Sequence, residues 1–137
     1  MNLPIHLTEK ELVKIYERFE GKCVLTKSIN INCEHFIPVS WGHGGTYTGN
    51  VYLLNQSLNI SKGSLNPFKW VNRSDVKRKI NQKEWKKLIR YLAGKNKMSI
   101  EEFKEFVYWC EKNKRTAEEA KLDGNISSVD LWKLSKR

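Results

Sequence analysis

The chain has 137 residues and a mass of 16.1 kDa, which is room for one domain with a sizeable apolar core. Hydrophobic residues make up 39% and charged residues 29%, a composition that excludes a disordered tail. No apolar run approaches the roughly 20 residues of a membrane span, and residues 1–6 lack the basic and apolar segments of a secretion signal. We therefore expect neither an integral membrane protein nor a secreted one, and no membrane partner.

The cysteines are few and scattered. Cys23, Cys33 and Cys110 form no Cys-x-x-Cys pair, which argues against a disulfide framework and against a tetrahedral zinc knuckle. We expect all three to be reduced, with Cys33 and Cys110 acting as small hydrophobes among apolar neighbours. A reducing, cytoplasmic compartment follows.

The positive charge is concentrated in one segment. Lysine and arginine number 25 against 15 acidic residues, a net charge of +10, and residues 69–97 alone hold eleven basic residues against two acidic ones. Such an excess is typical of a polyanion partner, although a solvated lysine-rich helix face and, less well, an anionic membrane surface also fit. The candidate contacts are Lys69, Arg73, Lys77, Arg78, Lys83, Lys86, Lys87 and Arg90.

The first half of the chain is predicted to form a helix followed by short strands. Thr8 and Glu11 form a capping box that opens a helix, which ends at Gly21. Strands are predicted over 23–26, 29–37 and 51–54, with a glycine-rich loop over 42–45. A short helix follows over 55–61, and Asn55 is positioned to cap it.

The second half is predicted to be helical. Apolar residues recur at helical spacing over 82–93 and 99–114, and shorter helices are predicted from 116 to 123 and over 129–134. The fold class is therefore α+β in a single domain spanning 1–137, with a β-containing core over about 21–70 and a helical, basic extension over about 71–137. We expect the aromatic side chains of the extension to lie in the core rather than to stack on bases.

The residues with chemical potential lie between 33 and 63. Glu34 and His35 are adjacent at the end of a strand, and Asn59 lies on the helix that follows the next strand. Mg²⁺ takes a few protein oxygen ligands and keeps water and phosphate for the rest, so Glu34 and Asn59 together could hold it. Imidazole suits a general base near neutral pH. Because side chains alternate along a strand, a twist or bulge must bring Glu34 and His35 to one site.

The order of these residues points to a known family. The stretch contains, in sequence, Glu34-His35, Pro38, Ser40, Gly44-Gly45, Asn50-Val51 and Asn59-Ile60-Ser61-Lys62-Gly63. In this order and spacing it resembles the HNH endonuclease family, whose core is the ββα-metal fold, over residues 21–70. The interval of nine positions between the two motif asparagines is that of the nuclease domain of RNA-guided CRISPR effectors.

The resemblance implies a role for each residue. His35 would be the general base, Glu34 and Asn59 would bind Mg²⁺ or Mn²⁺, and Asn50 would brace the loop that aims His35. Lys62 would lie near the scissile phosphate. Glu34 stands where the family commonly has Asp, and the paired cysteines of many relatives are absent, so no structural zinc is expected.

Several functions share these motifs. The resemblance favours cleavage of double-stranded DNA by a small free-standing nuclease of the phage or homing type, acting in the host cytoplasm if phage-encoded. A phage packaging or restriction nuclease, a ribonuclease, and a non-catalytic DNA-binding module on a nuclease fold remain alternatives. His6 is expected to be an ordinary structural histidine, and His43 a loop residue, with a phosphate or metal contact as the alternative for His43.

Overall fold

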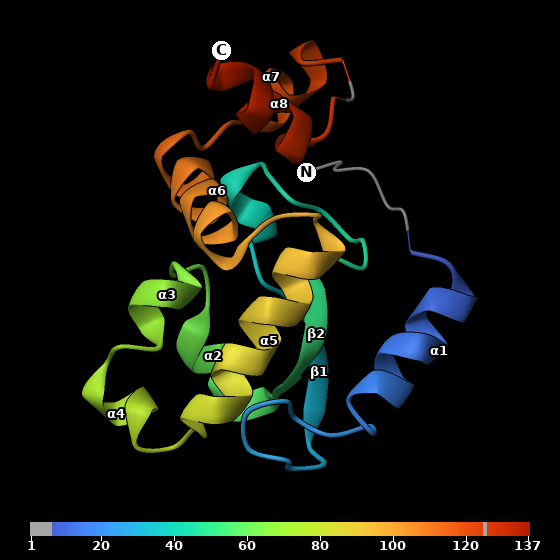
Figure 1. Cartoon of the computed structure of the whole chain (residues 1–137), viewed down its shortest axis with the longest axis vertical. Helices are drawn as coiled ribbons and strands as arrows, with labels where there is room; N and C mark the ends of the chain where they lie inside the picture. The colour runs from blue at the N-terminus through green and yellow to red at the C-terminus, as the bar shows by residue number, and fades with distance from the viewer. Residues whose placement is uncertain (1–6, 125) are drawn as a thin grey trace.

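The computed structural model describes residues 7–124 and 126–137, so the expectations for residues 1–6, including His6, lie outside the described residues. Helices and one small sheet make up the fold, which confirms the α+β class (Figure 1). In chain order the elements are α1 (Glu9–Arg18), β1 (Ile31–His35), the 3₁₀ helix η1 (Val39–Trp41), β2 (Val51–Asn55), α2 (Gln56–Lys62), α3 (Pro67–Trp70), α4 (Ser74–Lys77), α5 (Gln82–Lys95), α6 (Ile100–Lys112), α7 (Ala117–Leu122) and α8 (Ser128–Ser135).

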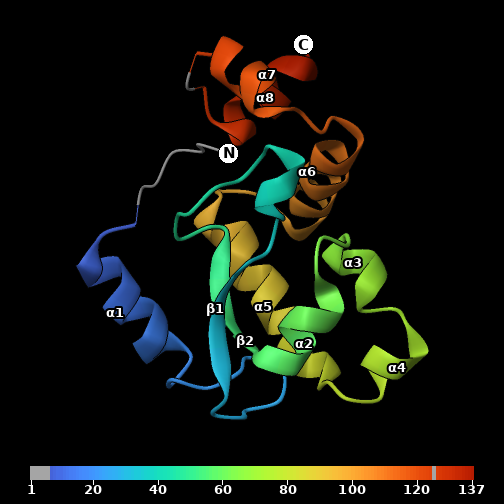
Figure 2. The same cartoon turned by 180° about the vertical axis from the view of Figure 1, so that it is seen from behind.

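The sheet has two antiparallel strands, and the second leads directly into helix α2. The strands pair residue by residue from Ile31 opposite Asn55 to His35 opposite Val51. β2 is almost fully buried, whereas β1 is partly exposed along its length. Viewed from behind, both strands lie in front of α5, with α2 beside them (Figure 2).

Short local signals set where the helices begin. The Thr8 and Glu11 side chains form the expected capping box at α1. At α2 the Asn55 side chain accepts hydrogen bonds from the backbone N–H groups of Ser57 and Leu58, which satisfies two donors left free at a helix start. Because Asn55 is also the last residue of β2, the passage from strand to helix takes no linker.

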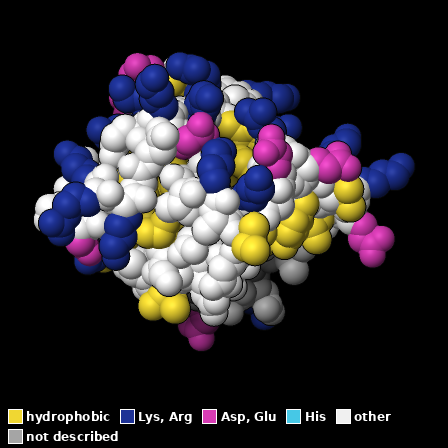
Figure 3. Space-filling model, turned by 90° about the horizontal axis from the view of Figure 1, so that it is seen from below, with side chains coloured by type: hydrophobic (Ala, Val, Ile, Leu, Met, Phe, Trp, Pro, Cys, Tyr) yellow, Lys and Arg dark blue, Asp and Glu magenta, His cyan; other side chains and the backbone are white. Residues whose placement is uncertain are grey.

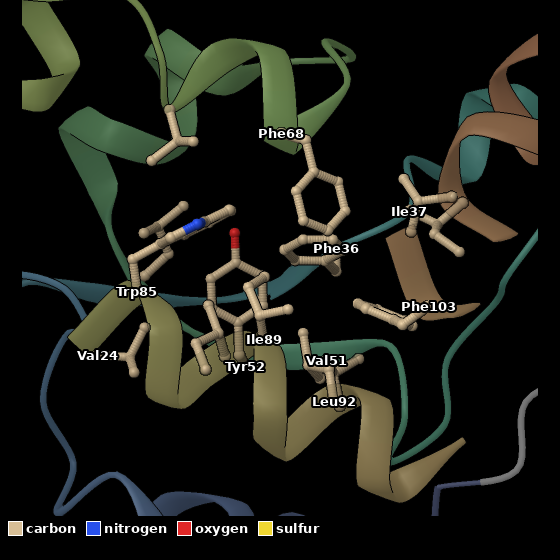
Figure 4. Close-up of a cluster of buried hydrophobic side chains, with 14 of the residues drawn as sticks. Val24, Phe36, Ile37, Val51, Tyr52, Phe68, Trp85, Ile89, Leu92 and Phe103 are labelled. Carbon is tan, nitrogen blue, oxygen red and sulfur yellow. The ribbon is translucent and has the colours of Figure 1, made fainter. Parts of the chain in front are cut away.

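An aromatic cluster fixes the chain immediately after β1. The Phe36 ring lies 5.6 Å from Phe68, 5.9 Å from Trp85 and 5.5 Å from Phe103, measured between ring centroids. These rings come from α3, α5 and α6 (Figure 4). Burying each such side chain stabilises the fold by roughly 1.5–3 kcal/mol. The residue next to His35 is therefore held by α3, α5 and α6.

Three expectations were wrong in detail. Residues 23–26 form a turn rather than a strand, although the Val24 N–H donates to the Leu53 carbonyl over 3.0 Å. Cys33 is exposed rather than buried, whereas Cys23 and Cys110 are buried. Cys33 lies on β1, which has only one neighbouring strand and so leaves part of its surface open. The short helices α3 and α4 also form between the helices predicted over 55–61 and 82–93, where no separate element was predicted.

No helix in the described part of the chain has both the length and the apolar character to cross a bilayer.

Candidate active site at the end of β1

A buried lysine joins α2 to the end of β1. The Lys62 Nζ atom donates a hydrogen bond to the backbone carbonyl of His35 over 3.1 Å and lies 3.8 Å from Glu34 Oε2. Only 1% of the Lys62 side chain is exposed. Burial lowers the pKa of Lys62, and the nearby Glu34 carboxylate opposes that shift. The C-terminal turn of α2 is thus bound to the strand residue expected to act as a base.

Asn59 lies on the same helix, three residues before Lys62. Residues three apart on a helix are neighbours on one face. Asn59 is half-buried, whereas the next residue, Ile60, is 76% exposed and faces solvent. Lys62 meets the end of β1, and Asn59 lies one turn before it on α2. Among the described residues, no hydrogen bond joins the Asn59 side chain to Glu34 or His35.

The Glu34 carboxylate folds back along its own strand. Its Oε1 atom accepts a hydrogen bond of 2.6 Å from the backbone N–H of His35. Directly opposite lies Tyr52, which is buried and whose hydroxyl has no hydrogen-bond partner among the described residues. Burial raises the pKa of Tyr52 well above its ordinary value, and the Glu34 charge adds to that effect. One carboxylate oxygen is thus engaged by the backbone and the other lies near Lys62.

His35 is half-buried and held through its ring. Its Nε2 atom lies 2.8 Å from Thr46 Oγ1. Burial lowers the pKa of His35; Glu34 raises it and Lys62 lowers it further. The neutral imidazole, which is the form that accepts a proton, is therefore favoured near neutral pH. The pairing from Ile31 to His35 is regular, so β1 contains no bulge and the Glu34 and His35 side chains alternate along the strand. Of the expected twist or bulge, only a twist of the strand end is left to bring them to one site.

Asn50 ties the glycine loop to the segment after β1. Its side chain is fully buried. The Asn50 Oδ1 atom accepts from the Ile37 N–H over 2.7 Å, and its Nδ2 donates to the carbonyls of Ile37 (3.2 Å) and Gly45 (2.9 Å). Gly44 has a φ of 76°, and a Cβ there would lie 2.7 Å from Asn50 Nδ2. The loop can approach Asn50 this closely only because glycine occupies that position.

The C-terminal helices hold the other side of this loop. His43 is buried, with Nδ1 3.0 Å from Ser128 Oγ and Nε2 2.7 Å from the Asn113 carbonyl. Ser128 Oγ also accepts from the Gly44 N–H over 3.1 Å. Arg115 Nε donates to the carbonyl of Gly42. The loop therefore lies between Asn50 and the segments that carry α7 and α8.

Sequence reasoning did not identify Thr46 or Ser128. Thr46 is 11 residues from His35, and Ser128 is 85 residues from His43. Neither pair has a characteristic spacing, because each contact forms only when distant segments pack. The glycines around residue 44 were the only signal in this region of the sequence.

The oxygen donors that Glu34 and Asn59 offer are of the type that suits a hard cation. The described residues contain no group of three or more His, Cys, Asp or Glu side chains arranged to hold a metal. Glu34 offers one carboxylate and Asn59 one amide oxygen. Two protein oxygens fit a cation such as Mg²⁺, which keeps water and substrate oxygens in its shell. The same pair does not fit zinc, which prefers nitrogen and sulfur ligands.

The basic residues nominated from the sequence are all exposed. Three of them are partly neutralised: Lys69 lies 2.9 Å from Glu111, Arg73 2.8 Å from Asp75 and Lys87 3.6 Å from Glu84. Dark blue Lys and Arg side chains gather at the upper edge and left side of the face in Figure 3. Among the described residues, the nominated residues that form no ion pair are Lys77, Arg78, Lys83, Lys86 and Arg90.

The basic side of α5 faces away from the sheet. Trp85, Leu88 and Leu92 are buried on one side of the helix, and that side covers the sheet (Figure 1). Lys86 and Arg90 therefore extend from the opposite side. A polyanion on α5 would lie on the outer surface of the molecule rather than on the strands themselves.

The sequence matches no model of a known protein family and no curated protein.

Proposed function

We propose that this protein is an HNH-type endonuclease with a ββα-metal core, which hydrolyses DNA phosphodiester bonds with a divalent cation. The core comprises β1, β2 and α2, and the site comprises Glu34, His35 and Asn59. The proposal rests on the sequence motifs together with the way these elements meet.

One observation carries the proposal: the hydrogen bond from Lys62 Nζ to the His35 carbonyl. It joins the helix that bears the motif residue Asn59 to the strand end that bears Glu34 and His35. The adjacent carboxylate and imidazole on β1 and the distant amide on α2 are thereby carried by elements that touch.

Each site residue then has a chemical task. Glu34 and Asn59 would hold the cation, which supplies Lewis-acid stabilisation of the charge that develops on the phosphate and the leaving oxygen. His35 accepts the proton of the attacking water. Asn50 fixes the loop beside His35, and Lys62 holds the strand against α2. The Lys62 amine is enclosed and already bonded to β1. A direct contact between Lys62 and the scissile phosphate therefore rests on the family resemblance alone and stays a prediction.

The distribution of charge supports a nucleic-acid substrate. Exposed basic residues on α4 and α5 suit the phosphate backbone, and such contacts position a duplex without reading its sequence. The homing role, or alternatively a packaging or restriction role, is a finer proposal that rests on the family resemblance alone.

The proposal is tested by the relaxation of supercoiled plasmid with Mg²⁺ or Mn²⁺. The wild type should nick or linearise the plasmid, EDTA should stop the reaction, and His35→Ala should bind DNA equally well without cutting it. Binding without cleavage by both proteins, under every metal tried, would instead favour a non-catalytic DNA-binding module. Preferential cleavage of a matched RNA would make the protein a ribonuclease.

A further inference from the structure

Thr46 makes the only side-chain hydrogen bond that the described residues offer to the His35 ring. The Thr46 hydroxyl oxygen lies 2.8 Å from His35 Nε2, a normal length for such a bond. Both residues are half-buried, so water competes only in part for the contact.

The buried Asn50 side chain holds Thr46 and His35 close together. Asn50 donates to the carbonyl of Gly45, which precedes Thr46, and accepts from the N–H of Ile37, two residues after His35. The distance between the loop and the strand end is therefore set by Asn50 rather than by the Thr46 contact itself. The hydroxyl is placed beside the ring in advance.

The loop is also anchored from outside. The Gly44 N–H donates to Ser128 Oγ on α8, and His43 lies between Ser128 and the Asn113 carbonyl. Gly44 and Thr46 are two residues apart, so movement of Thr46 away from His35 would strain contacts on both sides of the loop. The arrangement has the character of a fixed support rather than of a mobile lid.

The direction of the Thr46 hydrogen bond decides which ring nitrogen can act. A neutral imidazole has one N–H and one lone pair. If Thr46 donates to Nε2, the ring proton is on Nδ1 and the only lone pair is occupied. If Thr46 accepts from Nε2–H, the Nδ1 lone pair is free to take a proton. Only the second arrangement leaves a base.

We infer that Thr46 is a positioning residue for His35: its hydroxyl accepts the hydrogen bond from Nε2–H and so assigns Nδ1 as the atom that accepts the proton of water. This inference rests on the proposed nuclease function. It adds to that function a residue that no motif contains, and it assigns the proton to a single atom.

His43 supplies an internal reference for the ring protons. Its Nε2 faces the carbonyl of Asn113, which can only accept, so Nε2 carries the proton. Its Nδ1 then accepts from the Ser128 hydroxyl. The ¹⁵N signals of His43 therefore provide the reference pattern for a neutral histidine ring protonated at Nε2 in this protein.

The test combines ring ¹⁵N spectra of histidine-labelled protein at one pH with kinetics on plasmid DNA. The variants are Thr46→Val, which removes the hydroxyl, and Thr46→Ser, which keeps it. The wild-type His35 ring should show the Nε2–H pattern of His43. Thr46→Val should mix the two tautomers and lower kcat by roughly 10- to 100-fold with little change in KM, and Thr46→Ser should restore both.

Three results would overturn the inference. A wild-type His35 ring with its proton on Nδ1 contradicts the assigned direction. If the wild type cleaves DNA and the Thr46→Val variant has the same His35 ring signals and the same kcat, the positioning role is contradicted and the nuclease function stands. If the wild type does not cleave DNA, the proposed nuclease function is contradicted and, with it, the assignment of Nδ1 as the atom that accepts the proton.

Discussion

The Lys62 amine reaches the backbone carbonyl of His35 over 3.1 Å from a side chain that is 1% exposed. A buried ammonium is costly unless it has partners, and here the partners are one carbonyl and the Glu34 carboxylate 3.8 Å away. The position of the α2 helix is therefore coupled to the residue proposed to be the base.

Replacing this amine should weaken the fold. Lys62→Met keeps most of the side-chain volume but leaves the His35 carbonyl without its partner, at a cost of about 1–3 kcal/mol. Urea unfolding measures the difference. The matched control is Lys86→Met on the exposed side of α5, which should change stability by less than about 0.5 kcal/mol. Equal stabilities for the two variants would show that the bond contributes nothing.

Local signals in the sequence were enough to predict the helix starts and the α+β class. Thr8, Asn55 and Ser99 all cap helices in the structure, because capping depends on residues within one helical turn. Strand boundaries were less accurate: residues 23–26 form a turn, since a strand depends on a partner that local sequence does not specify.

The residue types of the candidate site could be nominated from the sequence, but the contacts among the segments that carry them could not. The motifs nominated Glu34, His35 and Asn59, and α2 does pack on β1. The burial of Lys62 and the contact of Thr46 with His35 required the fold, because each joins segments without a characteristic spacing. No repeat or spacing in the sequence predicts the contact between α8 and the glycine loop either.

Asn50 and Asn59 should differ sharply when each is replaced by alanine. Asn50→Ala removes three buried hydrogen bonds and should lower the free energy of unfolding by about 2–4 kcal/mol. Asn59→Ala, on a half-buried helix face, should leave unfolding within about 1 kcal/mol of wild type yet abolish metal-dependent cleavage. Urea unfolding and plasmid cleavage report the two effects separately. A stable, fully active Asn59→Ala variant would remove Asn59 from the site.

His43 should make stability depend on pH. Burial lowers its pKa, although the hydrogen bond to the Asn113 carbonyl opposes the shift. With the folded-state pKa below that of the unfolded chain, near 6.5, the unfolded state binds the proton first as pH falls. The stabilisation is complete above that value and is lost as pH drops through it toward the folded-state pKa.

The comparison for this effect is His43→Asn, which cannot titrate. Urea unfolding between about pH 8 and pH 5 should show the wild type losing stability relative to the variant as the pH falls. Parallel profiles for the two proteins would contradict the buried, neutral state of His43.

The exposed basic residues should account for much of the salt dependence of DNA binding. Neutralising Lys83, Lys86 and Arg90 with glutamine should weaken binding to all sequences alike and reduce the slope of log K against log salt by about 0.9 per lost contact. The control variant carries the same replacement by glutamine at Lys10, Lys14 and Lys121, which are exposed on α1 and α7. An unchanged slope in the α5 variant would place the duplex elsewhere.

The measurement that tests the central proposal most directly is single-turnover cleavage of an end-labelled DNA duplex in Mg²⁺ by the wild type and His35→Ala. The proposed mechanism predicts metal-dependent cutting that leaves 5′-phosphate and 3′-hydroxyl ends. It also predicts a loss of at least roughly 100-fold in rate for His35→Ala at unchanged duplex affinity. Equal rates for the two proteins, or cutting that persists in EDTA, would contradict it.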